Sequence, residues 1–565
     1  MKFKDLKYER IDLAKTCEQL ENLAKRLQEA QDATTFKAIF QEICQLQMHI
    51  DTMGNLVSVR HSINTADEFY NEENDWWDMQ RPVLQKYFTD IANIAISKPY
   101  REELLDEIYE PYFKIAECKA RSFNEAIIPL LQQENKLISE YGKLKASAKI
   151  EFDGKECNLA QIAAYCSSQD RDIRKKAFDA KMRFYQDNEA KFDEIYDQLV
   201  HVRHQIALKL GYDNFIQVGY DRMLRLDYDA KMVSKYRDMI AKHVVPLAQE
   251  IVDAQANRIN VDKVRYYDYD YEFLSGNPKP VESYDEKIAA AKWMYHQMSK
   301  ETAEFIDVMI DNELWDLESK PNKELGGYCT EFPEYKLPFI FSNFNGTRGD
   351  VEVLTHEAGH ALNSYLAAKD INVPECVFPT LESCEIHSMS MEFFTYPYMH
   401  KFFGDDTQKY YYAHFSNVFK FLPYGVLVDH FQHEIYANPD MTPAQRKETW
   451  RKLERRYTPF KDYEGNEMLE KGCWWYQQGH IFASPFYYID YTLAQVCALQ
   501  FWDRMYNQDD KAWHDYIKLC RLGGTKTFLQ LVEEANLRSP FDDECLLATI
   551  EDAKAYLKTF DLAKF

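Results

Sequence analysis

The pentapeptide from His356 to His360, His-Glu-Ala-Gly-His, is the part of the sequence whose residue types and spacing best fit a chemical role. On a helix, residues i and i+4 lie on one face, so both imidazoles can reach a single metal ion. Glu357 is offset by about 100° around the helix axis, which places its carboxylate beside the metal, where it can take a proton from water. The pattern predicts a metal-dependent hydrolase site. The alternative is a pair of helix histidines with a purely structural role.

Two histidines and a water leave a catalytic zinc site one protein ligand short. Residues 381–392 supply the candidates, because this segment is typical of a helix and contains the acids Glu382, Glu385 and Glu392. On spacing alone, any of the three could bind the metal. His387 is a rival to Glu385 as the third ligand. The two side chains lie on different faces of the helix, so at most one of them points at the metal. Apolar residues interleave with the acids, which argues against a merely solvated helix face.

A late segment, residues 480–491, could supply hydrogen-bond donors to the reaction. It contains His480 and the tyrosines Tyr487, Tyr488 and Tyr491. Hydrolysis of an amide develops negative charge on the carbonyl oxygen, and a phenol or an imidazole can donate a hydrogen bond to that oxygen. The alternative is a packed aromatic core, because the chain has 39 tyrosines.

The elements that must position these residues are mostly helices. The 565 residues include only 18 glycines and 19 prolines, below average usage, and so few helix breakers predict a mainly α protein. Two stretches differ. Alternating residues at 148–157 around Asp153-Gly154 predict a β-hairpin. The apolar run from Leu337 to Phe344, with Pro338 at its start, predicts a short strand.

We divide the chain into an N-terminal helical region, 1–190, with its short hairpin near 148–157, and a region that carries the candidate site, 191–565. The formal net charge of −24 disfavours nucleic acid and a basic membrane-surface role. No apolar run approaches the ~18 residues that span a membrane, and no secretory signal is visible. The twelve cysteines are scattered without a Cys-x-x-Cys pair, so we expect free buried thiols and a cytoplasmic protein.

The sequence resembles the zinc oligopeptidase family of oligoendopeptidase F, thimet oligopeptidase and the Pz-peptidases, and it is most similar to oligoendopeptidase F in motif and length. The similarity covers residues from about 148 to the C-terminus, whereas the first hundred residues are similar only in character. The motifs that resemble the family are residues 344–351 before His-Glu-Ala-Gly-His-Ala-Leu362, the pattern Glu-x-x-Ser-x-x-x-Glu formed by Glu385, Ser388 and Glu392, residues 199–203 with 207–212, the Asp153-Gly154 hairpin and Gly327-Tyr-Cys329.

The resemblance implies a role for each candidate residue. One zinc ion per chain would be held by His356, His360 and Glu385, with Glu357 as the general base. Two further acids, Glu352 and Glu392, would orient the ligating imidazoles. The residues placed over the substrate carbonyl would be His480, Tyr491 and Tyr488, with Tyr487 as a further candidate, because this segment has one residue more before Pro485 than the usual oligoendopeptidase pattern.

The resemblance also implies the architecture and the activity. We expect two helical halves that enclose a deep substrate channel, with the zinc on its floor and a small β-sheet near it. The strand 337–344 would form the sheet edge, and a peptide would pair with it at Phe341, Ser342 and Asn343. The expected protein is a zinc metalloendopeptidase, an oligoendopeptidase that cleaves internal bonds of short oligopeptides as a monomer, with no nucleic-acid or membrane partner.

Two other functions remain open from the residues alone. A helical zinc carboxypeptidase or dipeptidase needs a cation for the terminal carboxylate of its substrate, and the sequence does not locate one. A non-catalytic peptide-binding protein would have an inert site. The presence of Glu357 argues against this second alternative, because a binding protein has no need of a general base.

Overall fold

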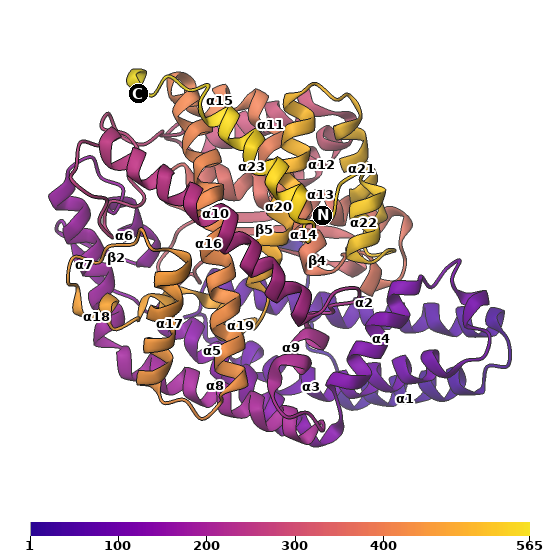
Figure 1. Ribbon diagram of the computed structural model, residues 1–565. Coiled ribbons are helices and arrows are strands. Elements are labelled where there is room, and N and C mark those ends of the chain that lie inside the picture. The colour runs from indigo at the N-terminus through magenta and orange to yellow at the C-terminus, as the bar shows by residue number, and fades with distance from the viewer. Residues whose placement is uncertain (1) are drawn as a thin grey trace.

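The computed structural model describes residues 2–565, and most of this length is helical (Figure 1). The prediction of a mainly α fold is confirmed. The first helices begin after aspartates, Asp12, Asp32 and Asp67, whose side chains accept backbone hydrogen bonds and so cap α1, α2 and α3. These helices and α4 extend to the lower right in Figure 1. Their bounds are α1 Leu13–Glu29, α2 Ala33–Ile63, α3 Glu68–Ser97 and α4 Glu110–Ser122.

The remaining helices form the rest of the molecule, in which the long helices α10 and α16 pack against each other (Figure 1). The bounds are α5 Ile128–Ala146, α6 Leu159–Tyr165, α7 Arg171–Asp187, α8 Glu189–Lys209, α9 Phe215–Arg222, α10 Ala230–Arg258, α11 Tyr284–Met298, α12 Lys300–Asp311, α13 Gly349–Asp370, α14 Leu381–Phe394, α15 His400–Phe403, α16 Thr407–Ala437, α17 Pro443–Tyr457, α18 Glu467–Glu470, α19 Gly479–Ala483, α20 Tyr488–Tyr506, α21 Lys511–Leu522, α22 Phe528–Glu534 and α23 Asp543–Leu557.

The predicted hairpin is confirmed. Strands β1 (Ile150–Phe152) and β2 (Lys155–Cys157) pair antiparallel. Asp153 and Gly154 form the turn between them with φ angles of 52° and 72°. Both angles lie in the left-handed region, as a two-residue turn between twisted strands requires.

The second sheet has three strands, and the predicted strand at 337–344 lies in its middle. The order is β3 (Trp315–Glu318), β5 (Leu337–Phe344), β4 (Tyr328–Phe332), with β3 parallel and β4 antiparallel to β5. The existence of β5 is confirmed, but its predicted place at the sheet edge is wrong. The run of buried apolar residues along β5 suits a strand that is covered on both faces and paired on both sides.

The strand β5 stands between two hydrophobic cores, because its successive side chains point to opposite faces. Phe339 and Phe341 join a core formed mainly by residues from Leu6 to Ala116. Ile340 and Phe344 join the larger core of the rest of the molecule. The predicted division of the chain at residue 190 stays a prediction.

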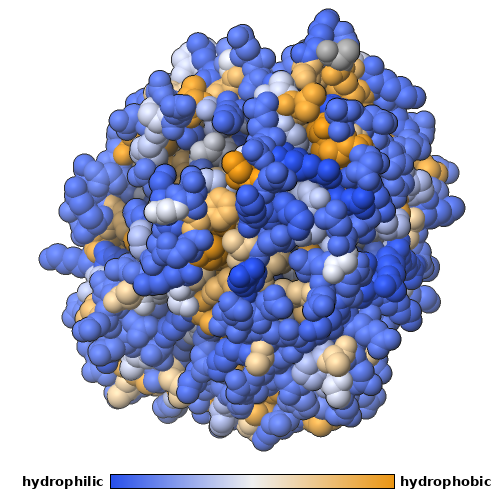
Figure 2. Space-filling view, turned by 90° about the vertical axis from the view of Figure 1, so that its left-hand side faces the viewer, coloured by the Kyte–Doolittle hydropathy of each residue, from blue (hydrophilic) through white to orange (hydrophobic). Residues whose placement is uncertain are grey.

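The free cysteines and the mainly hydrophilic surface agree with the amino-acid composition. All twelve cysteines are free, as predicted, and most are buried. The face in Figure 2 is mainly hydrophilic, with apolar side chains visible mostly in recesses and in one patch near the top. Among the described helices, none has both the length and the apolarity needed to cross a membrane.

Helices α13 and α14 come into backbone contact at Gly359. A Cβ atom at Gly359 would lie 2.5 Å from the carbonyl oxygen of His387 and 2.6 Å from the Cα atom of Ser388. Glycine inside a helix costs about 1 kcal/mol relative to alanine. The glycine therefore weakens α13 locally, and it permits a helix crossing that no larger residue allows.

We expect Gly359→Ala to lower the free energy of unfolding by about 1–3 kcal/mol, since the new methyl group overpacks a backbone contact. Thermal unfolding followed by circular dichroism measures the effect. The matched control is Gly142→Ala in α5, where the nearest atom to the new Cβ is Glu324 Oε1 at 3.6 Å. Better helix propensity should leave this control as stable as the wild type or more stable. Equal melting temperatures for Gly359→Ala and wild type would contradict the crossing.

Candidate active site

The structure brings together the three residues expected to bind a metal. His356 and His360 lie one turn apart on α13, and Glu385 faces them from α14. The ligand atoms of the three residues lie within 4.8 Å of one another. Glu385 Oε2 is 3.2 Å from His356 Nε2 and 3.4 Å from His360 Nε2. Among the candidates on α14, Glu385 is the residue that meets the histidine pair.

The rival candidates on α14 point elsewhere. The carboxylate of Glu382 accepts a hydrogen bond from Arg225 Nη1 at 3.1 Å. The ring of His387 is buried, and neither of its nitrogens is hydrogen-bonded to His356, His360 or Glu385. Neither residue belongs to the group that could hold a metal ion.

The two acids expected to orient the histidines differ in their contacts. Glu392 is 2.7 Å from His356 Nδ1 and, through its other oxygen, 2.7 Å from His414 Nε2. Glu352 pairs with Arg348 at 3.6 Å and makes no hydrogen bond with either candidate ligand histidine in residues 2–565. Only Glu392 therefore has the geometry of an acid that fixes an imidazole. Sequence reasoning missed His414, which lies in a tyrosine-rich stretch typical of packing.

Glu357 is buried beside this cluster and faces a cavity of about 470 Å³. Burial raises the pKa of its carboxyl group, while His356 and His360 act in the opposite direction. Its Oε2 atom has no hydrogen-bond partner among the described residues. A buried carboxylate oxygen without a partner is costly, which suits an atom whose partner is a reacting molecule.

Residues 480–491 cover the other side of this cavity. His480 Nε2 is 3.0 Å from the hydroxyl oxygen of Tyr491, and Gln478 lies 2.9 Å from His480 Nδ1. Tyr487 donates a hydrogen bond of 2.5 Å to Glu385 Oε1. Tyr488 instead lines an adjoining cavity of about 260 Å³, which shares His480 and Tyr491 with the central one.

The protonation states follow from burial. Burial lowers the pKa of His480 to about 4, so its ring is neutral near pH 7. Burial, followed by the nearby Glu385 charge, raises the pKa of both Tyr487 and Tyr491 well above 10. Both phenols therefore keep their protons and can act as hydrogen-bond donors.

A buried arginine fixes the backbone that precedes Tyr487. Phe486 has a φ of 68°, a left-handed conformation that is unusual for a bulky residue. Arg225 Nη2 donates to the carbonyl oxygen of Phe486 at 2.8 Å, and the same guanidinium pairs with Asp490 at 2.6 Å. Gly219 leaves space for the Phe486 ring, because a Cβ there would lie 2.5 Å from it. No short motif marks Arg225 or Gly219 in the sequence.

The strand beside the cavity is β4 and not β5, which corrects the expected substrate edge. Gly327 and the first four residues of β4, 328–331, line the cavity. On the central strand β5, Phe341 and Ser342 are buried. Asn343 donates hydrogen bonds to the carbonyl oxygens of Glu324 and Gly326, at 2.8 and 2.9 Å, and so holds the loop that leads into β4.

Comparison with known proteins gives the family. The profile of the Peptidase M3 N-terminal domain matches residues 3–123, and that of Peptidase family M3 matches residues 164–549. The fold and these matches define a metalloendopeptidase. The chain belongs to peptidase family M3, and the predicted resemblance to oligoendopeptidase F and the Pz-peptidases is confirmed. Among curated proteins, no match was found.

Solved structures are similar over the full length. Pz-peptidase A with an inhibitor is 47% identical, with a TM-score of 0.98 over 99% of this chain and 100% of that one. A candidate oligoendopeptidase F, from crystals grown by microfluidic seeding, is 46% identical, with a TM-score of 0.99 over 100% of both chains. A candidate oligoendopeptidase F from Bacillus anthracis is 45% identical, with a TM-score of 0.94 over 100% of this chain and 99% of that one.

We expect the ring of His480 to stay neutral between pH 5 and pH 8. Its pKa of about 4 lies below the ordinary 6.5, so only the unfolded chain takes up this proton between those values. His480 therefore reduces stability as the pH falls from 6.5 towards 4. NMR titration of histidine-labelled protein measures the ring, with the signal assigned by its loss in His480→Gln. A titration midpoint near 6.5, as for free histidine, would contradict a buried neutral ring.

Proposed function

We propose that the chain is a zinc-dependent oligoendopeptidase with one zinc ion held by His356, His360 and Glu385. The observation that carries the proposal is the spacing of the three donor atoms. Two ligands ~2.0–2.1 Å from a tetrahedral ion lie ~3.3–3.4 Å apart. The distances from Glu385 Oε2 to the two Nε2 atoms are 3.2 and 3.4 Å. Two imidazoles and a carboxylate are a donor set of catalytic zinc, which keeps one further position open.

Glu357 is the general base of the proposed reaction. When bound, zinc would act as a Lewis acid and lower the pKa of the attacking water towards ~7. The unpaired Oε2 atom of Glu357 accepts a proton from the attacking water, and the carboxyl group later gives this proton to the leaving amine. Burial raises the pKa of Glu357, which favours the protonated form that the second step needs.

Four residues of the 480–491 segment assist in this proposal. Tyr491 is the donor to the oxyanion, and neutral His480 holds the Tyr491 hydroxyl at 3.0 Å. Tyr487 is a positioning residue, because its hydroxyl is already bonded to Glu385 Oε1. Tyr488 lines the adjoining cavity, so we assign it to substrate contact there.

The proposed substrates are short peptides in extended conformation. The central cavity adjoins the 260 Å³ cavity at His480 and Tyr491, and that one adjoins a cavity of about 400 Å³ at Asn417 and Phe421. A row of narrow cavities admits an extended chain and excludes a folded one. We place the added peptide strand on β4, since β5 has no free edge.

The alternatives find less support. A carboxypeptidase or dipeptidase would need a cation close to the scissile bond, and the described lining of the central cavity has no lysine or arginine. A pure binding protein would have no use for the unpaired Glu357 carboxylate. A cytoplasmic location is part of the proposal, because all twelve cysteines are free and disulfides form in oxidising compartments. The monomeric state stays a prediction.

We expect Glu357→Gln to keep its zinc and to lose roughly 10²–10⁴-fold or more in kcat, because the amide cannot accept the proton. Mass spectrometry of digests of a peptide ladder, ~4 to 40 residues long, measures cleavage, and atomic absorption measures zinc. Internal cuts that occur only in the shorter peptides, and are absent with Glu357→Gln, are the expected result.

Two other results of the ladder would decide against the proposal. Stepwise removal of residues from one terminus would favour the exopeptidase alternative. Zinc-loaded wild type that cleaves no peptide would favour the binding protein.

We expect Glu392→Gln to weaken zinc binding by about 10–100-fold, since the amide no longer supplies the charged acceptor that orients His356. Competition with a chelator measures the zinc affinity. Glu352→Gln is the matched control, because Glu352 pairs with Arg348 and should leave the zinc affinity unchanged. The assignment fails if the two variants lose equal affinity.

A further inference from the structure

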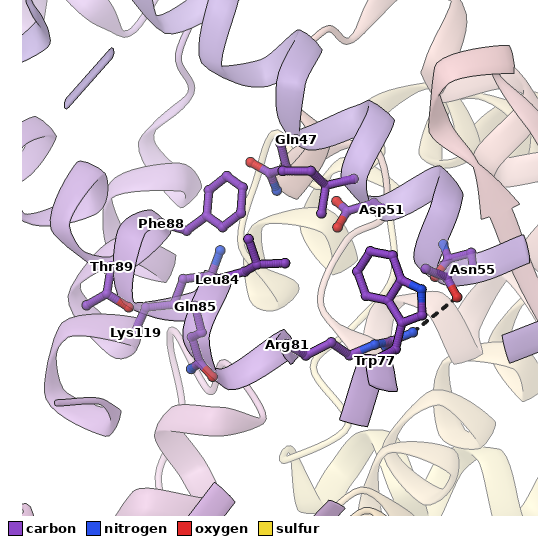
Figure 3. Close-up of a pocket in the computed structure, with 12 residues that line it drawn as sticks. Gln47, Asp51, Asn55, Trp77, Arg81, Leu84, Gln85, Phe88, Thr89 and Lys119 are labelled. Carbon is purple, nitrogen blue, oxygen red and sulfur yellow. Dashed lines mark hydrogen bonds between the residues drawn. The ribbon is translucent and has the colours of Figure 1, made fainter. Parts of the chain in front are cut away.

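A separate cavity of about 250 Å³ lies among the N-terminal helices α2, α3 and α4 (Figure 3). Its charged lining residues are Asp51 on α2, Arg81 on α3 and Lys119 on α4. Figure 3 shows Asp51 on one helix and Arg81 on the facing helix, with Trp77 between them. None of these residues takes part in the site described above.

This cavity meets the central cavity at one residue. Asn55 lines both, and its side-chain amide donates to the carbonyl oxygen of Glu331 on β4 at 2.9 Å. Gly327 lies against Glu357, since a Cβ there would be 3.3 Å from Glu357 Oε1. Glu331 is four residues further along β4, or about 13 Å at 3.3 Å per residue. An extended peptide with its scissile bond beside Glu357 thus reaches Asn55 within about four residues.

Arg81 forms no direct ion pair among the described residues, although the carboxylates of Asp78 and Asp51 act on its charge from further away. Its Nη2 atom donates to Ser58 Oγ at 2.9 Å and to the carbonyl oxygen of Gly54 at 3.3 Å, the bond drawn in Figure 3. Among residues 2–565, no carboxylate lies within 4.0 Å of its guanidinium, whereas Lys119 pairs with Glu375 at 3.1 Å. Arg81 is exposed to solvent, so water reaches the donors that the protein leaves free, and its guanidinium stays charged.

We propose that this cavity is a subsite for a carboxylate of the bound peptide, with Arg81 as the principal contact. The inference rests on the proposed peptidase function and adds a preference among substrates. A guanidinium and a carboxylate pair through two parallel hydrogen bonds, and Arg81 has donors free for them. The Asn55 amide lies at the junction through which the peptide passes. The carboxylate could be the C-terminus or an acidic side chain, which share this chemistry.

Asp51 allows a bound carboxylate to be distinguished from a bound ammonium. It also faces the cavity, and burial raises its pKa to about 6. It is therefore mostly ionised near pH 7 and loses its charge as the pH falls below about 6, whereas Arg81 stays charged. A bound carboxylate is repelled by ionised Asp51 and attracted by Arg81. A bound ammonium would show the reverse preference for both residues.

The experiment compares one cleaved peptide of about ten residues in matched forms. One pair has a free or an amidated C-terminus, and a second pair has glutamate or glutamine at each acidic position. We expect Arg81→Gln to raise KM for the carboxylate form by roughly 10-fold or more and to leave its amide partner and kcat unchanged. Asp51→Asn should lower KM for the carboxylate form. The pair that responds identifies the source of the carboxylate.

Arg60→Gln is the control for structural effects. Arg60 also joins α2 to α3, through a 2.9 Å hydrogen bond to the Tyr70 hydroxyl, and it does not line the cavity. This control should leave KM unchanged for every peptide, and thermal unfolding checks that each variant folds. Equal KM for the acid and amide forms with wild type, or a rise in KM with Asp51→Asn, would overturn the subsite.

Direct binding separates this inference from the proposed function. Calorimetry with the Glu357→Gln protein measures the dissociation constants of the same peptides without cleavage. Tighter binding of the carboxylate form, lost with Arg81→Gln, supports the subsite even if turnover is absent. Equal binding of both forms by a protein that cleaves peptides refutes the subsite alone.

Discussion

The contact of α13 with α14 at Gly359 is the constraint on which the candidate site depends. A side chain at this position would meet the backbone of His387 and Ser388. Because the helices touch there, Glu385, two residues before His387, comes within 3.4 Å of His360 Nε2. The same carbonyl oxygen is held from α21 as well, since Tyr516 donates a 2.8 Å hydrogen bond to it. The third candidate ligand is thus positioned by contacts of α14 with both α13 and α21.

Two buried arginines position the segment that faces these ligands. Arg203 Nη2 donates to the carbonyl oxygen of Phe482 at 2.6 Å, and Arg225 Nη2 donates to that of Phe486 at 2.8 Å. Each guanidinium also pairs with a buried acid, Glu134 for Arg203 and Asp490 for Arg225. Burying such pairs is costly, and the hydrogen bonds to the two backbone carbonyls offset part of that cost, although Arg225 Nε has no partner among the described residues. The connection between α19 and α20 therefore has a fixed course despite its irregular backbone.

The sequence predicted what local periodicity encodes and missed what tertiary contacts decide. His356, Glu357 and His360 could be placed on one helix from their spacing, and an acid of residues 381–392 could be expected opposite them. The resemblance to a known family pointed to Glu385 among those acids. The choice between Glu352 and Glu392 as the partner of His356 depends on the crossing of two helices, which spacing within one helix does not contain. The central place of β5 depends on β3 and β4, whose short segments carry no strong strand pattern.

The charges of the central cavity explain why a metal ion suits this fold. Its described lining includes the acids Glu331, Glu357 and Glu385 but neither lysine nor arginine. Burial, together with Asp51, raises the pKa of Glu331 to about 7, and burial also raises that of Glu357. Acids in such surroundings repel one another when ionised. His356 and His360 offset part of this repulsion at Glu357 and Glu385, and the described lining has no lysine or arginine to offset the rest. A divalent cation at Glu385 would supply the missing positive charge, so metal affinity and the ionisation of these acids must be coupled. The permanent charge of Arg81 lies in the neighbouring cavity, beyond Asn55, so it would act on a part of a bound peptide distant from the candidate metal site.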